Sequence, residues 1–135
     1  MFKGINWIGV IVADVVYFGL AFAWFGPVGG PLYRQLMPQG PSVGFDATAL
    51  IGFLIGLVIM TGLAWVLVRT GARTLGSAVL TALVVTIAFD TTVYAGFAMT
   101  GQPPRLMAFF AAFDLVAFAV GAVVLTLLKG KTAEV

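Results

Sequence analysis

Three aspartates, Asp14, Asp90 and Asp114, lie within long apolar stretches, and their type and setting make them the residues best able to do chemistry. An ionised carboxylate in the middle of a bilayer costs about 2.5–3.5 kcal/mol on insertion scales. No lysine or arginine lies in the same stretches to neutralise them. Burial and mutual repulsion disfavour three charged carboxylates, so at least one should carry a proton near neutral pH. The aspartates are therefore candidates for a proton, ion or substrate site.

Hydroxyl groups lie one helical turn away from two of these aspartates. Tyr17 follows Asp14 by three positions. Thr86 and Tyr94 flank Asp90, each four positions away. Residues at these spacings share a helix face, where a hydroxyl can hydrogen-bond a carboxyl group. We therefore expect Tyr17, Tyr94 and Thr86 to belong to the same candidate site.

Asp114 has no polar neighbour at the equivalent positions. Phe110 precedes it by four residues and Phe118 follows it by four, so its partner is expected on another helix. Ala117 and Gly121 continue its face, and small residues there allow a neighbouring helix to approach closely. Gly121 is therefore predicted to be a helix-packing residue.

Asp90 and Asp114 are equally spaced about Gln102, which lies in a short polar segment. In an antiparallel hairpin this spacing places the two carboxyl groups at the same level. At about 1.5 Å of rise per residue, Asp14 should lie about one or two turns deeper. We expect the three to form one interior polar cluster. The alternative is that neutral aspartic acids only hydrogen-bond the helices to one another.

The composition indicates a membrane protein. Apolar residues make up 61% of the chain and charged residues 9%, against roughly a quarter charged in ordinary globular proteins. Four apolar runs, at about 5–25, 48–68, 75–99 and 106–128, approach the roughly 20 residues that cross a bilayer. Each must be helical, because a helix satisfies its own backbone groups in lipid. The sequence predicts an all-α, integral membrane four-helix bundle of two antiparallel hairpins, forming one domain over 1–135.

The first outer loop, at 26–47, is long and rich in proline and glycine, which prevents a continuous helix. Within it, the segment from Pro31 to Met37 could form one or two turns, with the proline at the first helical position. It is expected to be a short interfacial helix or a lid over the outer mouth of the bundle. The run 5–25 is expected to be retained, because it is too long for a signal peptide and Asp14 interrupts it.

Basic residues near the helix ends predict the orientation. An even number of crossings places both termini and the second loop on one side, and lysine and arginine favour the cytoplasm. We expect a multi-pass protein of the bacterial inner membrane with both termini cytoplasmic. That side would hold Lys3, Arg69, Arg73, Lys129 and Lys131, and the other side Arg34 and Arg105.

Glycine and tryptophan patterns suggest packing and anchoring. Gly52 and Gly56 form a GxxxG pattern, typical of closely packed helices, and we favour packing within the chain over homodimerisation. Trp7, Trp24 and Trp65 fall near the expected boundaries and are interpreted as interfacial anchors. Stacking on a cofactor is the alternative for these rings.

The residue types also limit the chemistry. The chain has no cysteine and no histidine, which excludes disulfides, thiolate nucleophiles, histidine-ligated haem and serine–histidine catalysis. We expect no enzyme activity, catalytic residue, metal site or cofactor, and the net charge of +2 gives no support for nucleic-acid binding. The lipid bilayer is the expected partner. The first functional hypothesis is a small proton- or cation-coupled carrier. The alternative is an accessory or scaffold subunit of a membrane complex, or a homo-oligomer.

Three short motifs resemble one protein family. They are Asn6-Trp7, Trp24-Phe25-Gly26-Pro27 and the stretch from Phe110 to Val116. They are similar to motifs of small bacterial four-helix membrane proteins catalogued as domain of unknown function 1761. That family tends to have polar or aromatic residues in its fourth helix, where this chain has Asp114, and neither Asp14 nor Asp90 can be carried over from it. The resemblance implies the four-helix topology and no particular activity.

Overall fold

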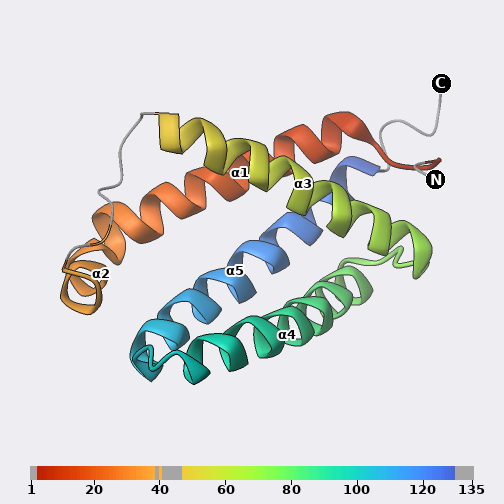
Figure 1. The fold of residues 1–135 in the computed structure, drawn as a ribbon. Helices are drawn as coiled ribbons and strands as arrows, with labels where there is room; N and C mark the ends of the chain where they lie inside the picture. The colour runs from red at the N-terminus through yellow and green to blue at the C-terminus, as the bar shows by residue number, and fades with distance from the viewer. Residues whose placement is uncertain (1–2, 39, 41–46, 130–135) are drawn as a thin grey trace.

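The fold was obtained as a computed structural model, which describes residues 3–38, 40 and 47–129. In these residues the chain is helical and contains no strand (Figure 1). In chain order the elements are α1 (Trp7–Ala23), the π-helix η1 (Trp24–Val28), α2 (Gly30–Leu36), α3 (Ala47–Arg69), α4 (Leu75–Met99) and α5 (Pro104–Lys129). Four of the helical stretches are long and apolar enough to cross a membrane. The predicted all-α, four-span membrane fold is confirmed.

The four spans form two antiparallel pairs, with α5 in the middle (Figure 1). α5 packs against α4 on one side and against α1 on the other, and α3 lies across α1. Alanines line the closest contacts: Ala13, Ala78, Ala82, Ala117 and Ala122 are fully buried. Small side chains let helix backbones approach closely, which is how helices associate in lipid without a hydrophobic driving force. α3 and α4 meet near the turn that joins them and diverge toward their other ends (Figure 1).

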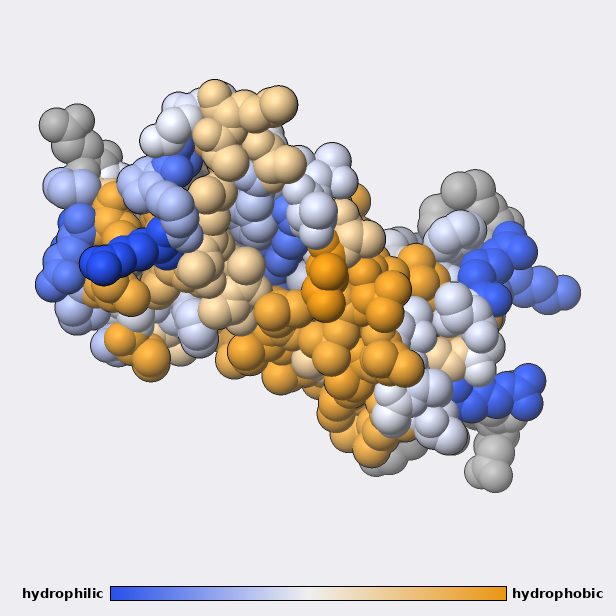
Figure 2. Space-filling view, turned by 90° about the horizontal axis from the view of Figure 1, so that it is seen from below, coloured by the Kyte–Doolittle hydropathy of each residue, from blue (hydrophilic) through white to orange (hydrophobic). Residues whose placement is uncertain are grey.

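Charged and polar residues mark the two ends of the molecule. Figure 2 shows hydrophilic residues gathered at both ends, with a broad hydrophobic region between them. We call the end with the two chain termini and the α3–α4 turn the termini end, which holds Lys3, Arg69 and Arg73. The opposite end, the α2 end, holds Arg34 and Arg105. This pattern fits a bundle whose sides face lipid and whose ends face water.

The first span extends further along the chain than expected, because the helix does not end at Pro27. Proline has no N–H to donate to the preceding turn. The helix widens at this point into η1, where Gly29 N donates to Trp24 O at 2.8 Å. A Cβ on Gly29 would overlap that carbonyl oxygen and come within 2.9 Å of the Phe109 ring. Regular α-helix ends at Ala23, close to the expected end, and the π-helix continues the span to Val28, after which Gly29 provides the room for the chain to turn.

The short helix predicted in the first loop is present as α2. Pro31 lies in its first turn, and its N-cap Gly29 accepts a hydrogen bond from Tyr33 N at 2.8 Å. Tyr33 is only 8% exposed, and its ring stacks on Phe109 at 6.2 Å between centroids. α2 therefore covers the α2 end of α5. The rest of the predicted loop, at 39 and 41–46, lies outside the described residues.

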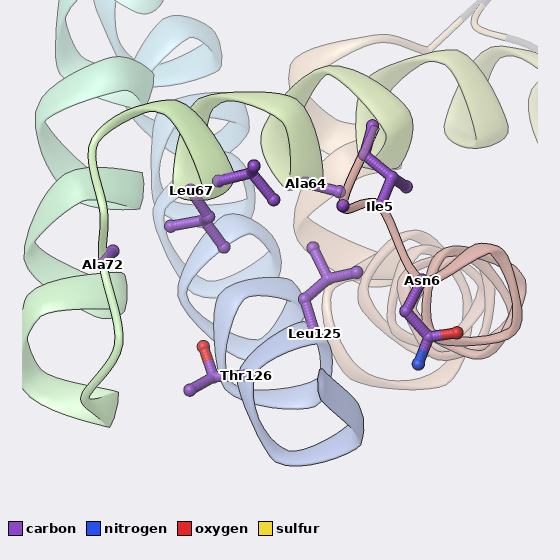
Figure 3. A pocket seen from close by; sticks show the side chains of 9 residues that line it. Ile5, Asn6, Ala64, Leu67, Ala72, Leu125 and Thr126 are labelled. Atoms are coloured by element: carbon purple, nitrogen blue, oxygen red, sulfur yellow. The ribbon is translucent and has the colours of Figure 1, made fainter. Parts of the chain in front are cut away.

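At the termini end, Asn6 joins the start of α1 to the end of α5. Its Oδ1 accepts a hydrogen bond from Ile8 N at 3.1 Å, which makes it the N-cap of α1. Its Nδ2 donates to the carbonyl of Leu128 at 3.1 Å, one of the last-turn carbonyls that lack a partner within the helix. Figure 3 shows Asn6 beside a small pocket, which also touches Leu67 and Leu125. Its volume of about 20 Å³ is sufficient for one water molecule.

Candidate functional site

The α4–α5 hairpin brings Asp90, Tyr94 and Asp114 together. Tyr94 Oη donates a hydrogen bond to Asp114 Oδ2 at 2.9 Å. Asp90 and Asp114 line the same pocket and are close enough to interact electrostatically. The tight turn at Gln102 holds the two helices in the register that puts both aspartates at one level. The partner of Asp114 thus lies on another helix, as its apolar flanks led us to expect.

Asp90 and Asp114 form an acidic pair in an apolar setting. Asp90 is only 7% exposed, and no lysine or arginine is among the residues that line the pocket shared by the two acids. Two neighbouring carboxylates repel each other, which disfavours ionisation of both at once. Protons leave such a pair in steps that belong to both residues together.

The pair lines a pocket of about 330 Å³ between the outer parts of α4 and α5, near the α2 end. The polar residues of its lining are Asp90, Asp114, Tyr94 and Gln102. The remaining lining residues are apolar or aromatic: Met37, Phe89, Val93, Phe97, Leu106, Met107 and Phe110. We call this cavity the α4–α5 pocket. The sequence did not single out most of these apolar residues, because only the helix pairing selects them from the many others.

The local hydroxyl partners predicted for Asp90 were wrong. Thr86 is fully buried, but its Oγ1 donates to the carbonyl of Ala82 at 2.8 Å. Tyr94, four residues after Asp90 on the same helix, reaches across to Asp114 instead. In a helix a threonine hydroxyl readily bonds the carbonyl four residues back, and that bond removes it from the site. Tyr94 belongs to the candidate site and Thr86 supports the helix beneath it.

Asp14 is separate from the carboxyl pair. It is 0% exposed, and neither of its side-chain oxygens has a hydrogen-bond partner among the described residues. Gly56 of α3 lies so close that a Cβ there would overlap Asp14 Oδ1. Asp14 does not line the α4–α5 pocket. The expected cluster of three aspartates is therefore a pair and one isolated, buried acid.

Tyr17 lies between these two acidic positions. Its hydroxyl is within electrostatic range of Asp114 and, more weakly, of Asp14. It also interacts electrostatically with Tyr94. Its ring packs against Phe113 of α5, with 5.6 Å between centroids. Tyr17 is thus directed toward α5, and it is not a hydrogen-bond partner for the neighbouring Asp14, whose oxygens are unpaired.

Aromatic rings fill the space between η1, α2 and α5. Trp24 lies 5.7 Å from Phe109 between ring centroids, and Phe25 lies 5.2 Å from Phe113. The Trp24 indole N–H is buried without an acceptor in the described residues, as is that of Trp65, and the interfacial-anchor role of both residues stays a prediction. The π-helix changes the direction of the side chains that follow it, and sequence spacing does not reveal that change.

The other two tryptophans lie toward the termini end. Trp7 is 51% exposed, as an interfacial anchor would be. Trp65 is partly buried, and the Arg69 guanidinium lies 5.5 Å from its ring centroid. A cation over an indole face is a favourable contact, worth about 0.5–1 kcal/mol at exposed sites. This contact contributes to the position of the Trp65 ring.

The glycines singled out in the sequence contact other helices of the same chain. Gly52 lies 4.0 Å from Phe18 of α1, measured from the position of a Cβ, and Gly56 contacts Asp14. A Cβ on Gly121 would lie 2.9 Å from the sulfur of Met60 on α3. Gly56 and Gly121 therefore provide space for a larger side chain of a neighbouring helix, whereas a Cβ at Gly52 would make only an ordinary van der Waals contact.

The fold and this site define a class of protein: a four-span membrane protein with a paired carboxyl site in an apolar pocket. The chain belongs to the family described as Protein of unknown function (DUF1761), whose model matches residues 8–126. No curated protein matches the chain. No solved structure matches it either.

Proposed function

We propose that the protein is a small proton- or cation-coupled carrier whose binding site is the α4–α5 pocket. The observation behind this proposal is the pair of Asp90 and Asp114 in the wall of a pocket of about 330 Å³. Ionisable residues within membrane spans are costly, and they commonly mark proton and ion pathways. A pair that only joined two helices would not need a cavity beside it.

The charge of the pair suggests how coupling would work. With one proton, the pair has one negative charge and can accept a monovalent cation. With two protons, it is neutral and has no charge to offer. A proton and a cation therefore compete for the same site, and the site is neutral with either one bound. Neutral occupied states cost less to move within a membrane than charged ones.

The distribution of basic residues suggests the membrane side on which each end of the protein lies. Lys3, Arg69 and Arg73 lie at the termini end and Arg34 and Arg105 at the α2 end, and positive charge favours the cytoplasmic side. We therefore place the protein in the bacterial inner membrane, with the termini end in the cytoplasm. The pocket, near the α2 end, would then lie in the outer half of the bilayer.

Proton movement in reconstituted vesicles tests the carrier. Purified protein is inserted into liposomes that contain a pH-sensitive dye, and cations are added outside. Wild-type protein should release protons when a bound cation enters, and Asp114→Asn and Asp90→Asn should each reduce the rate at least tenfold. Thr91→Val is the matched control, because Thr91 is exposed and its hydroxyl only bonds the carbonyl of Ile87. Equal rates in the wild type and both Asn variants would overturn the proposal.

An accessory role is the second candidate, supported by the uncovered side between α3 and α4. These helices diverge away from their turn, and Gly62 and Gly76 have nothing within 4 Å of a Cβ. A partner helix of a larger complex, or a second copy of the chain, could pack there. Purification in a mild detergent decides between the candidates: a single small species with no partner would argue against the accessory role.

A further inference from the structure

We infer that the ligand of the α4–α5 pocket is an organic monocation with apolar groups, such as a substituted ammonium ion. The inference rests on the proposed function and specifies the substrate class of the same site. Three features of the lining lead to it: the sign of its charge, the nature of its walls and the small number of its oxygen ligands.

The charge of the lining favours one positive charge. Asp90 and Asp114 are its ionisable acids, and no lysine or arginine is among the lining residues. Because two neighbouring carboxylates in an apolar pocket repel each other, one of them keeps its proton, which leaves a single negative charge on the pair. Tyr94 donates to Asp114 Oδ2 at 2.9 Å and so holds that carboxyl group in place. A monocation neutralises the pocket, while an anion would be repelled and a dication would leave a buried positive charge.

The walls of the pocket suit apolar groups attached to that charge. Phe89, Phe97 and Phe110 present aromatic rings, and a cation is attracted to the face of such a ring. Met37 and Met107 add flexible, polarizable side chains that adapt to irregular ligands. Apolar substituents of the ligand would pack against these residues and be shielded from water.

A bare metal ion would be poorly held in the same space. Hard cations such as Ca²⁺ take about 6–8 oxygen ligands, and Mg²⁺ keeps a strict octahedral shell. The lining offers oxygens from Asp90, Asp114, Tyr94 and Gln102 only. Across residues 3–38, 40 and 47–129 there is no group of three or more acidic, histidine or cysteine side chains that could hold a metal ion. An organic cation needs no such shell, because its charge is already partly surrounded by its own apolar groups.

Equilibrium binding of a matched pair of probes tests this inference. Benzyltrimethylammonium has an aromatic ring and a fixed positive charge, and neopentylbenzene has the same shape without the charge. Radiolabelled benzyltrimethylammonium should bind wild-type protein in lipid nanodiscs at one saturable site. Neopentylbenzene should fail to compete at equal concentration. Binding should weaken at least tenfold in Asp114→Asn and Asp90→Asn, and not in Thr91→Val.

Two further measurements do not depend on the Asn variants: binding to aromatic variants, and the pH dependence of binding to the wild type. If the Asn variants do not fold, Phe97→Leu and Phe110→Leu remove aromatic faces and should each weaken binding several-fold. In the wild type, affinity should fall about tenfold per pH unit once the pair takes up its second proton. Competition by neopentylbenzene, or unchanged binding in all four variants, would overturn the inference. If benzyltrimethylammonium binds but no protons move in vesicles, the carrier proposal is overturned and the inferred ligand class remains. If protons move only with inorganic cations, the inferred ligand class is overturned and the carrier proposal remains.

Discussion

Gly56 of α3 lies directly against the carboxyl group of Asp14 on α1, and no larger residue could stand in its place without displacing that carboxyl group. This contact joins the glycine pattern of one helix to the buried acid of another. It closes α3 onto α1 at a point where both side-chain oxygens of Asp14 lack a hydrogen bond among the described residues. The contact therefore depends on the shapes of the two residues.

Gly56→Ala should destabilise the protein by about 1–3 kcal/mol, the usual cost of overpacking an interior contact. Thermal unfolding in detergent, followed by circular dichroism, measures the change. Gly62→Ala on the same helix is the control, because nothing lies within 4 Å of a Cβ at that position. Equal unfolding temperatures for the two variants would contradict the close approach of α3 and α1.

Asp14→Asn should leave the stability at neutral pH within about 1 kcal/mol of wild type. The amide has nearly the shape of the carboxyl group, and neither side-chain oxygen of Asp14 has a hydrogen-bond partner among the described residues that the change would remove. The same unfolding measurement applies, with Asp14→Ala as a comparison that leaves a cavity. A large loss in Asp14→Asn would mean that a negative charge at this position is required for folding.

Asn6→Ala should cost about 1–2 kcal/mol, because it removes the N-cap of α1 together with the hydrogen bond to Leu128. Asn6→Ser separates the two roles, since serine can cap the helix and is too short to replace the amide that reaches α5. Its stability should fall between those of wild type and Asn6→Ala. If Asn6→Ser matched the wild type, the bond between the ends of α1 and α5 would contribute nothing.

Gly29→Ala should disturb the junction of η1 and α2, because a Cβ there would overlap the Trp24 carbonyl oxygen and crowd Phe109. Gly26→Ala, in the same π-helix, has open space around its Cβ and serves as the control. Limited proteolysis should cut the first loop faster in Gly29→Ala than in Gly26→Ala. Identical cleavage rates would count against a close-packed junction.

The four spans were predictable because lipid imposes a simple rule on sequence: about 20 apolar residues, all helical. The run expected at 75–99 is α4, Leu75–Met99, without a shift. The level placement of Asp90 and Asp114 also followed from the sequence, since a short turn and a constant helical rise fix the register. Helical geometry within one span or one hairpin therefore determines the spans and the level of the two aspartates.

The remaining features depend on contacts between helices that are distant in sequence. Tyr94 bonds Asp114 on α5 because of how α4 is rotated against it, and spacing along one helix cannot give that rotation. The isolation of Asp14 depends on Gly56 occupying the space beside it. The π-helix at Trp24–Val28 was not predictable either, because a proline does not by itself indicate how a helix adapts to it. Only the assembled bundle determines these positions.

The contact between Asp14 and Gly56 also bears on how the protein is made. Translation delivers α1 to the membrane first, and Gly56 is synthesised roughly 40 residues after Asp14, a delay of about 2–8 s at ordinary rates of about 5–20 residues per second. During that interval Asp14 has no neighbouring helix from its own chain to cover it. Because a lone ionised carboxylate in lipid is costly, α1 and α3 should enter the bilayer most readily together, as one hairpin delivered by the translocon.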